Sequence, residues 1–111
     1  MIINKVDTAT IGDLVRKVLA GHERTCFIVD DSSFLVGVVS EGDLLRAIWG
    51  GIDLDAPAND YLNHNPISIL ESADNPEIEA ISIFKKHGVV SVPVVTSQRK
   101  LIRILNVREF I

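Results

Sequence analysis

The sequence has a single cysteine, no long apolar run and no excess of positive charge. Each of these features excludes a class of structure or partner. Cys26 is the one cysteine among 111 residues, so no internal disulfide can form. Because Cys26 stands in an apolar stretch, we expect a small core residue in a protein from a reducing compartment. No run approaches the roughly 20 apolar residues of a membrane-spanning helix, and the N-terminus lacks a signal-peptide pattern. These features predict a cytoplasmic protein without a membrane partner.

Charge and histidine placement exclude further classes of function. The 11 Lys and Arg residues are outnumbered by 15 Asp and Glu, and they are scattered, which argues against nucleic acid as a partner. His22, His64 and His87 lie far apart with no acidic or thiol partner at metal-ligand spacing, so we expect no metal site. No candidate nucleophile has a base at a recognisable spacing, so the sequence does not predict an enzyme.

What the chain does contain is a globular composition and alternating helix and strand patterns. With 47% hydrophobic and 23% charged residues, it can bury roughly two thirds of its unfolded surface. The first half predicts, in order, a helix from Thr10 to Gly21, strands over 24–29 and 35–39, and a helix over 43–49. After a polar connection over 50–65, the second half predicts strand 67–70, helix 78–86, strands 89–95 and 101–105, and an unfinished helix over 106–111.

The two halves repeat with an offset of 66 residues. Ile28 falls on Val94 and Asp43 on Glu109, and the turn between the two strands has the same length in both halves. Each half is too small to be stable with one face of its sheet uncovered. We therefore predict an α+β fold in which two helix-strand-strand-helix repeats pack with pseudo-twofold symmetry and form two equivalent clefts.

One strand-to-helix junction in the first half predicts a binding site. Ser40 ends an apolar strand and Asp43 opens a helix, so free backbone N–H groups and the positive end of the helix dipole point to one place that suits an anion. Gly37, within the strand, lets another group come close to the backbone. Ser40 and Asp43 also have the spacing of a capping box, so helix capping alone is an open alternative.

The residues Gly37-Val38-Val39-Ser40-Glu41-Gly42-Asp43 resemble the junction motif of the tandem CBS domain pair, or Bateman module. The strand Cys26-Phe27-Ile28-Val29-Asp30, and its second copy Val92-Pro93-Val94-Val95, extend the resemblance over nearly the whole chain. The resemblance implies that residues 1–111 form one pair, with a first repeat over 1–56 and a second over 57–111. We expect the last helix of the second repeat to be truncated.

This resemblance implies a ligand and roles for individual residues. The cleft of such pairs commonly holds an adenosine-type ligand, so the expected ligand is an adenine nucleotide that regulates, rather than a catalytic cofactor. Asp43 would bind the ribose hydroxyls and Ser40 a phosphate, beside Gly37, with Arg24 as a further basic phosphate contact.

The second copy departs from the motif. Arg103, Asn106 and Glu109 replace the glycine, the hydroxyl residue and the aspartate. Asn and Glu at this spacing favour a helix cap, although an altered site, with Arg103 reaching a phosphate, stays open.

The segment over 43–67 looks more narrowly like CBS pairs that precede bacterial sugar-phosphate nucleotidyltransferase domains. That likeness implies a covalently attached catalytic domain, and we also expect a homodimer. The competing hypothesis is a structural, dimerising module without a nucleotide, whose contacts are the apolar helix faces around Leu44, Ile48 and Trp49 and around Ile81 and Phe84.

Overall fold

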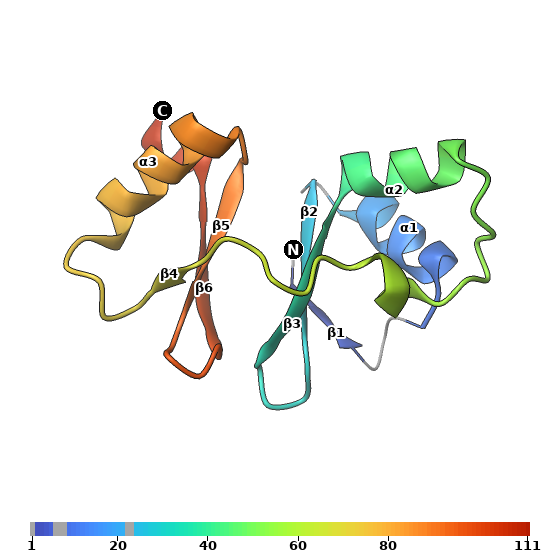
Figure 1. Cartoon of the computed structure of the whole chain (residues 1–111), viewed down its shortest axis with the longest axis horizontal. Helices are drawn as coiled ribbons and strands as arrows, with labels where there is room; N and C mark the ends of the chain where they lie inside the picture. Colours follow the sequence, from blue (N-terminus) through green and yellow to red (C-terminus); the bar gives the residue numbers. More distant parts are fainter. Residues whose placement is uncertain (1, 6–8, 22–23) are drawn as a thin grey trace. The chain divides into compact units, whose positions relative to one another are not determined.

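The computed structural model describes residues 2–5, 9–21 and 24–111 and contains two compact units, Met1–Pro66 and Ile67–Ile111 (Figure 1). The first unit runs β1 (Ile2–Asn4), α1 (Ile11–Ala20), β2 (Thr25–Val29), β3 (Leu35–Ser40), α2 (Glu41–Trp49) and the 3-10 helix η2 (Ala58–Tyr61). The second runs β4 (Ile69–Leu70), α3 (Pro76–His87), β5 (Ser91–Val95), β6 (Leu101–Asn106) and the 3-10 helix η3 (Val107–Phe110). The expected α+β fold class is confirmed.

Both units contain the same three-stranded sheet. The strand orders are β1-β2-β3 and β4-β5-β6, and in each sheet the first pair is parallel and the second antiparallel. Thr25 pairs with Ser40 as Ser91 pairs with Asn106, and each sheet has an irregularity at the equivalent place. The offset of 66 residues that the sequence predicts is therefore confirmed at the level of strand register.

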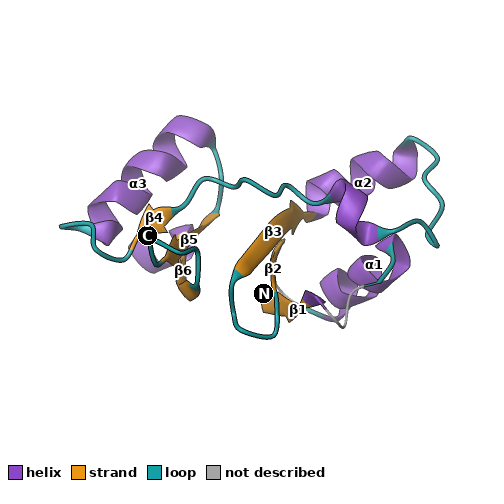
Figure 2. Cartoon of the chain, turned by 60° about the horizontal axis from the view of Figure 1, so that its bottom comes forward, coloured by secondary structure: helices purple, strands orange, loops and turns teal. Residues whose placement is uncertain are grey.

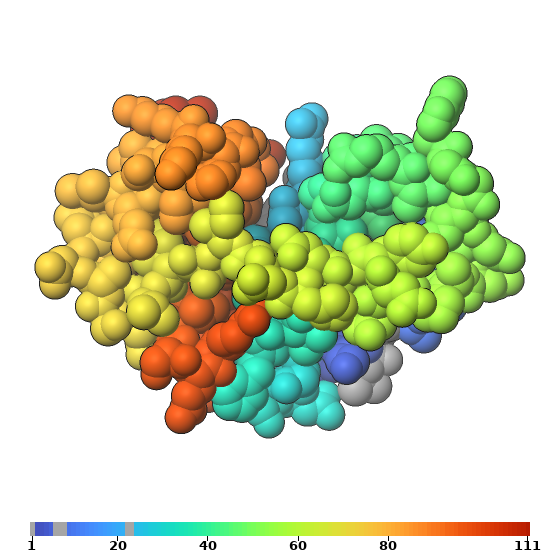
Figure 3. All heavy atoms as spheres, in the orientation of Figure 1, coloured from blue at the N-terminus to red at the C-terminus, as the bar shows by residue number. Residues whose placement is uncertain are grey.

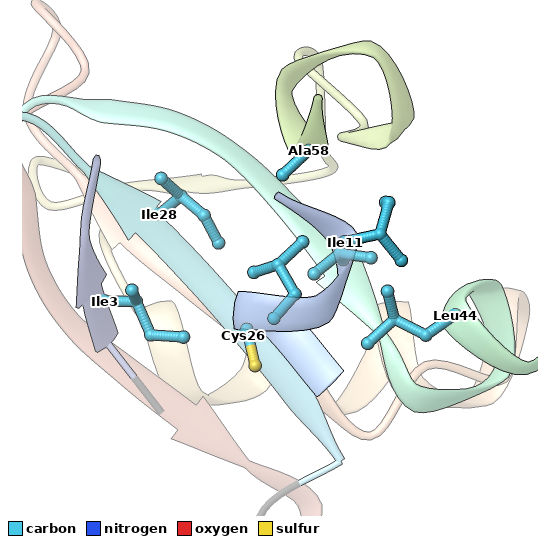
Figure 4. Packing of buried hydrophobic residues seen from close by; sticks show 8 residues of the cluster. Ile3, Ile11, Cys26, Ile28, Leu44 and Ala58 are labelled. Carbon is cyan, nitrogen blue, oxygen red and sulfur yellow. The ribbon is translucent and has the colours of Figure 1, made fainter. Parts of the chain in front are cut away.

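In each unit, helices cover one face of the sheet, as Figure 2 shows for α1 and α2 on the first sheet and α3 on the second. Side chains from all six elements of the first unit meet between these helices and the sheet (Figure 4). These buried residues are Ile3, Ile11, Leu14, Cys26, Ile28, Val39, Leu44 and Ala58. Cys26 is fully buried, so its prediction as a core residue is confirmed.

The connection that follows α2 belongs structurally to the first unit. Ala58 is buried in the core of that unit, and Pro57 pairs with Thr10 in an isolated bridge. In Figure 3 this part of the chain, coloured green to yellow-green, runs over the surface of the first unit. The first folded unit therefore extends to Pro66, whereas the second sequence repeat was expected to begin at residue 57.

Several elements differ from the sequence prediction. Strand β1 was not predicted, because only three residues form it and their strand state depends on parallel pairing with β2. The final helix is a single 3-10 turn, η3, rather than the start of an α-helix. Leu44 and Phe84, which the dimerising hypothesis places on contact faces, are buried in the cores of their own units, because each packs against the sheet of its unit. Within the described ranges, no helix has the length and apolarity to cross a membrane.

Candidate functional site

The β3–α2 junction holds Ser40 and Asp43 in a reciprocal capping box. The backbone N–H of Asp43 donates to Ser40 Oγ at 3.1 Å, and that of Ser40 donates to Asp43 Oδ2 at 3.0 Å. Ser40 keeps an extended backbone, with φ −99° and ψ 160°, so the chain turns directly from strand into helix. The geometry satisfies two of the N–H groups that a helix start leaves without partners.

The other carboxylate oxygen of Asp43 is bound by an arginine of the same helix. Arg46 Nη2 lies 2.5 Å from Asp43 Oδ1, and the Asp43 side chain is 46% exposed. Partial burial raises the pKa of Asp43, but hydrogen bonds from Ser40 and the Arg46 guanidinium outweigh burial and hold that pKa below its ordinary value. Asp43 is thus a carboxylate at neutral pH, accessible from solvent and able to accept further hydrogen bonds.

Arg24 lies at the same junction, as its expected role requires. Its carbonyl oxygen accepts a hydrogen bond from the backbone N–H of Glu41 at 2.7 Å, which brings the start of β2 beside the start of α2. Its Nε lies 3.8 Å from a carboxylate oxygen of Glu41, and the side chain of Arg24 is largely exposed while that of Glu41 is about half exposed. The fold therefore gathers Arg24, Ser40 and Asp43, three of the four residues that the resemblance implies, at the start of α2.

The space beside Gly37 is filled by the chain itself. A β-carbon on Gly37 would stand 3.0 Å from Leu62 Cβ and 3.1 Å from the carbonyl oxygen of Asn63. The next residue, Val38, exchanges two backbone hydrogen bonds of 2.9 Å with Asn63. The close approach expected at Gly37 is thus made by residues 62–63 of the chain itself, and it packs these residues against β3.

A second arrangement in the same unit shows that capping alone can produce this geometry. Thr10 and Asp13 form the same reciprocal box at the start of α1, with corresponding distances of 3.1 and 3.0 Å, and Arg16 pairs with Asp13. Hydrogen bonding therefore does not distinguish a ligand site at Ser40 from a structural cap. The Thr10–Asp13 pair therefore provides an internal control for experiments on Ser40 and Asp43.

The β6–η3 junction of the second unit has the same backbone register and different chemistry. Asn106 and Glu109 form a capping box, as their spacing predicts, and Asn106 Nδ2 also donates to Ser91 Oγ at 2.9 Å. Arg103 Nη2 lies 2.8 Å from a carboxylate oxygen of Glu77 at the start of α3, and this contact lowers the pKa of Glu77. Arg103, Asn106 and Glu109 thus each have a structural partner within the second unit.

Sequence reasoning missed Arg46 and residues 62–63. The i,i+3 spacing of Asp43 and Arg46 is a signal for the ion pair. Nothing in the sequence indicates that residues 62–63 would cover Gly37, because that contact is long-range. In the described part of the chain, no three His, Cys, Asp or Glu residues gather as a metal site would require, and His22 lies outside the described residues.

Comparison with known families and structures gives the site a context. The family model described as "CBS domain" matches residues 6–50 and again 58–111. A CBS domain protein from Pyrobaculum aerophilum, solved in complex with AMP, is 28% identical; the match covers 96% of this chain and 81% of that one, with a TM-score of 0.79. The CBS domain pair of protein MJ0100, solved with 5-methylthioadenosine and S-adenosyl-L-methionine, is similar in fold at 20% identity, with 99% and 85% covered and a TM-score of 0.77.

Curated relatives are longer than this chain. Arabinose 5-phosphate isomerase GutQ from Salmonella typhi is 29% identical over 83 residues, which are 75% of this chain and 25% of GutQ. An uncharacterized 17.7 kDa protein from Acidianus ambivalens is 23% identical over 100 residues, 90% of this chain and 59% of that protein. The chain thus spans between a quarter and three fifths of the length of these relatives.

Proposed function

The chain belongs to the CBS domain family as a tandem pair, and on that premise we propose that it is a non-catalytic regulatory module that binds an adenine nucleotide or a related adenosyl ligand. The observation that carries this proposal is the likeness to the Pyrobaculum aerophilum protein, which was solved with AMP and matches 96% of this chain at 28% identity. We place the ligand at the β3–α2 junction, where the side chains offer both a hydroxyl-binding carboxylate and cationic groups.

Each residue at the junction has a role in this proposal. Asp43 accepts hydrogen bonds from the two ribose hydroxyls, for which a carboxylate with an exposed edge is well suited. Ser40 contacts a phosphate, and Arg24 contributes positive charge beside it. Gly37 contributes indirectly, since the absence of a side chain lets residues 62–63 pack against β3. The Arg103, Asn106 and Glu109 cluster is proposed as a cap, because their side chains already have partners in the second unit.

Ligand occupancy would regulate an attached or associated domain. The match with GutQ, of which this chain spans 25%, supports a module that functions within or beside a larger protein. A sugar-phosphate nucleotidyltransferase as the attached domain stays a prediction. Regulation requires that the ligand bind two arrangements of the module with different affinity, since a ligand that binds both equally shifts nothing.

A thermal-shift titration with AMP, ADP, ATP, adenosine and S-adenosylmethionine tests the proposal. A ligand at 100 times its dissociation constant stabilises the folded state by about 2.7 kcal/mol, which is a readily measured rise in melting temperature. Asp43→Ala should abolish the rise, whereas Asp13→Ala, which removes the equivalent cap of α1, should leave it intact. A nucleotide-free wild type that no ligand stabilises would contradict the proposal.

A dimerising module without a nucleotide is the second candidate, and the surface of α2 favours it. Leu45, Ile48 and Trp49 are exposed on this helix, and Trp49 is 94% exposed. Such a patch is a common feature of subunit contacts. Light scattering after size exclusion tests this candidate, since a dimer that Trp49→Glu converts to a monomer would support it. Homodimer formation stays a prediction until that measurement is made.

A further inference from the structure

The side chain of Arg46 is held over the start of α2. Its Nη2 contacts Asp43 Oδ1 at 2.5 Å. Its Nη1 and Nη2 lie 3.4 and 3.9 Å from the place where a β-carbon of Gly42 would stand. The guanidinium therefore folds back along the helix toward the N-terminus of α2, and Gly42 leaves it the room to do so.

The hydroxyl of Ser40 shares this place with the guanidinium. Ser40 Oγ lies 3.8 Å from the same β-carbon position at Gly42. A guanidinium has five N–H donors in one plane, and in the described part of the chain Asp43 is the one carboxylate that pairs with Arg46. Its other donors face solvent, since 74% of the side chain is exposed. A planar guanidinium beside a hydroxyl is a good partner for a phosphate.

We propose that Arg46 donates to a phosphate of the ligand at the β3–α2 junction and so makes the site selective for a nucleoside phosphate over an uncharged or cationic adenosyl compound. This inference rests on the proposed function, because it presupposes that Asp43 receives the ribose. The two roles of Asp43 are compatible, since a carboxylate can accept about four hydrogen bonds and Ser40 and Arg46 each take one.

The charge balance at the junction supports this selectivity. Glu41 and Asp43 contribute two negative charges, which Arg24 and Arg46 neutralise in pairs. Without Arg46, a phosphate would lie beside two carboxylates with one neighbouring cation, so repulsion would increase with the charge of the ligand. An uncharged nucleoside would not be repelled by these carboxylates. The loss of affinity on removing Arg46 should therefore depend on the phosphate and not on the adenosine part.

Calorimetric titration of four proteins with AMP and adenosine tests this inference. Arg46→Gln should weaken AMP binding by about tenfold or more, as expected for a lost charge-assisted hydrogen bond, and change adenosine binding by less than about threefold. Arg46→Lys should recover part of the AMP affinity because it keeps the charge. Arg16→Gln removes the equivalent ion pair of α1 and should bind both ligands like the wild type.

The outcomes separate this inference from the proposed function. Equal weakening of AMP and adenosine by Arg46→Gln would mean that Arg46 only orients Asp43, and would overturn the inference. So would unchanged AMP affinity in that variant, or a wild type that binds adenosine as tightly as AMP. In all three cases the proposed nucleotide site would stand. A wild type that binds neither ligand would overturn both.

Discussion

The β3–α2 and β6–η3 junctions have equivalent strand register, yet they differ in every side chain on which a ligand would depend. The first joins Gly37, Ser40 and Asp43 to a nine-residue helix. The second joins Arg103, Asn106 and Glu109 to a four-residue 3-10 helix. The position that Gly37 leaves open for residues 62–63 is taken in the second unit by Arg103, which pairs with Glu77. A duplicated backbone can thus keep a helix cap in both copies while the side chains around the cap change.

The largest effect should come from closing the space at Gly37. Gly37→Val places a side chain where Leu62 and Asn63 now lie, so we expect it to destabilise the first unit by about 1–3 kcal/mol. Arg103→Val puts the same side chain at the equivalent position and should cost less than about 1 kcal/mol, since it removes a half-exposed ion pair. Urea unfolding monitored by hydrogen exchange in each unit measures both. Similar costs would contradict the difference between the junctions.

Removing the caps should separate stability from binding. Ser40→Ala and Asn106→Ala each remove a helix cap and should each cost about 1 kcal/mol of unfolding free energy. We expect AMP affinity to fall in Ser40→Ala alone, and Thr10→Ala to cost similar stability without loss of affinity. Denaturant unfolding and calorimetry on the same preparations give both quantities. If Asn106→Ala also weakened AMP binding, the second junction would have to be assigned a ligand.

The cap at the start of α2 should weaken when the pH falls below the ordinary pKa of aspartate. The pKa of Asp43 is lower in the folded chain than its ordinary value of 3.8, so its stabilising effect is present above that value. The effect is lost as the pH falls through the folded pKa, and affinity for a ribose should fall with it. Carboxyl NMR titration of the wild type and Arg46→Gln provides the measurement. The pKa of Asp43 should rise in the variant, and an unchanged value would contradict the role of the ion pair.

The smallest effect should be local to the second unit. Arg103→Ala removes the cation that lowers the pKa of Glu77, so that pKa should rise toward its ordinary value of 4.5. Nucleotide affinity should stay unchanged if the second junction is structural. NMR titration of Glu77 and calorimetry with AMP test the two statements. Weaker AMP binding would show that Arg103 takes part in a site.

Local sequence signals predicted most of the fold. Thr10 and Gly21 mark the ends of α1 because caps and helix-ending residues act over a few positions. The offset of 66 residues predicted the strand register, since apolar residues and turn length repeat together. Strand β1 depends on pairing with β2, some 25 residues away, and short strands carry little signal of their own.

The sequence predicted that three residues of the candidate site lie close together, but not how the chain packs around them. Ser40, Asp43 and Arg24 lie together as the resemblance implies, because they follow from a motif and from strand pairing. The contact of residues 62–63 with Gly37 depends on how the connection after α2 folds back, which has no local pattern. The ion pair of Arg46 with Asp43 has a signal in their i,i+3 spacing, whereas the position of the guanidinium beside Gly42 depends on the side-chain rotamer.

The return of the chain to β3 also has a consequence for biosynthesis. The core of the first unit includes Ala58, and the outer edge of β3 is completed by Asn63. On the ribosome, we therefore expect the first unit to stay open when α2 emerges, although its two α-helices and three strands have by then been synthesised. We expect closure only after about 15 further residues, including η2 and Asn63, have left the exit tunnel. A fragment that stops at Trp49 would expose an incomplete core, and a dissection after Pro66 is the one that keeps this unit whole.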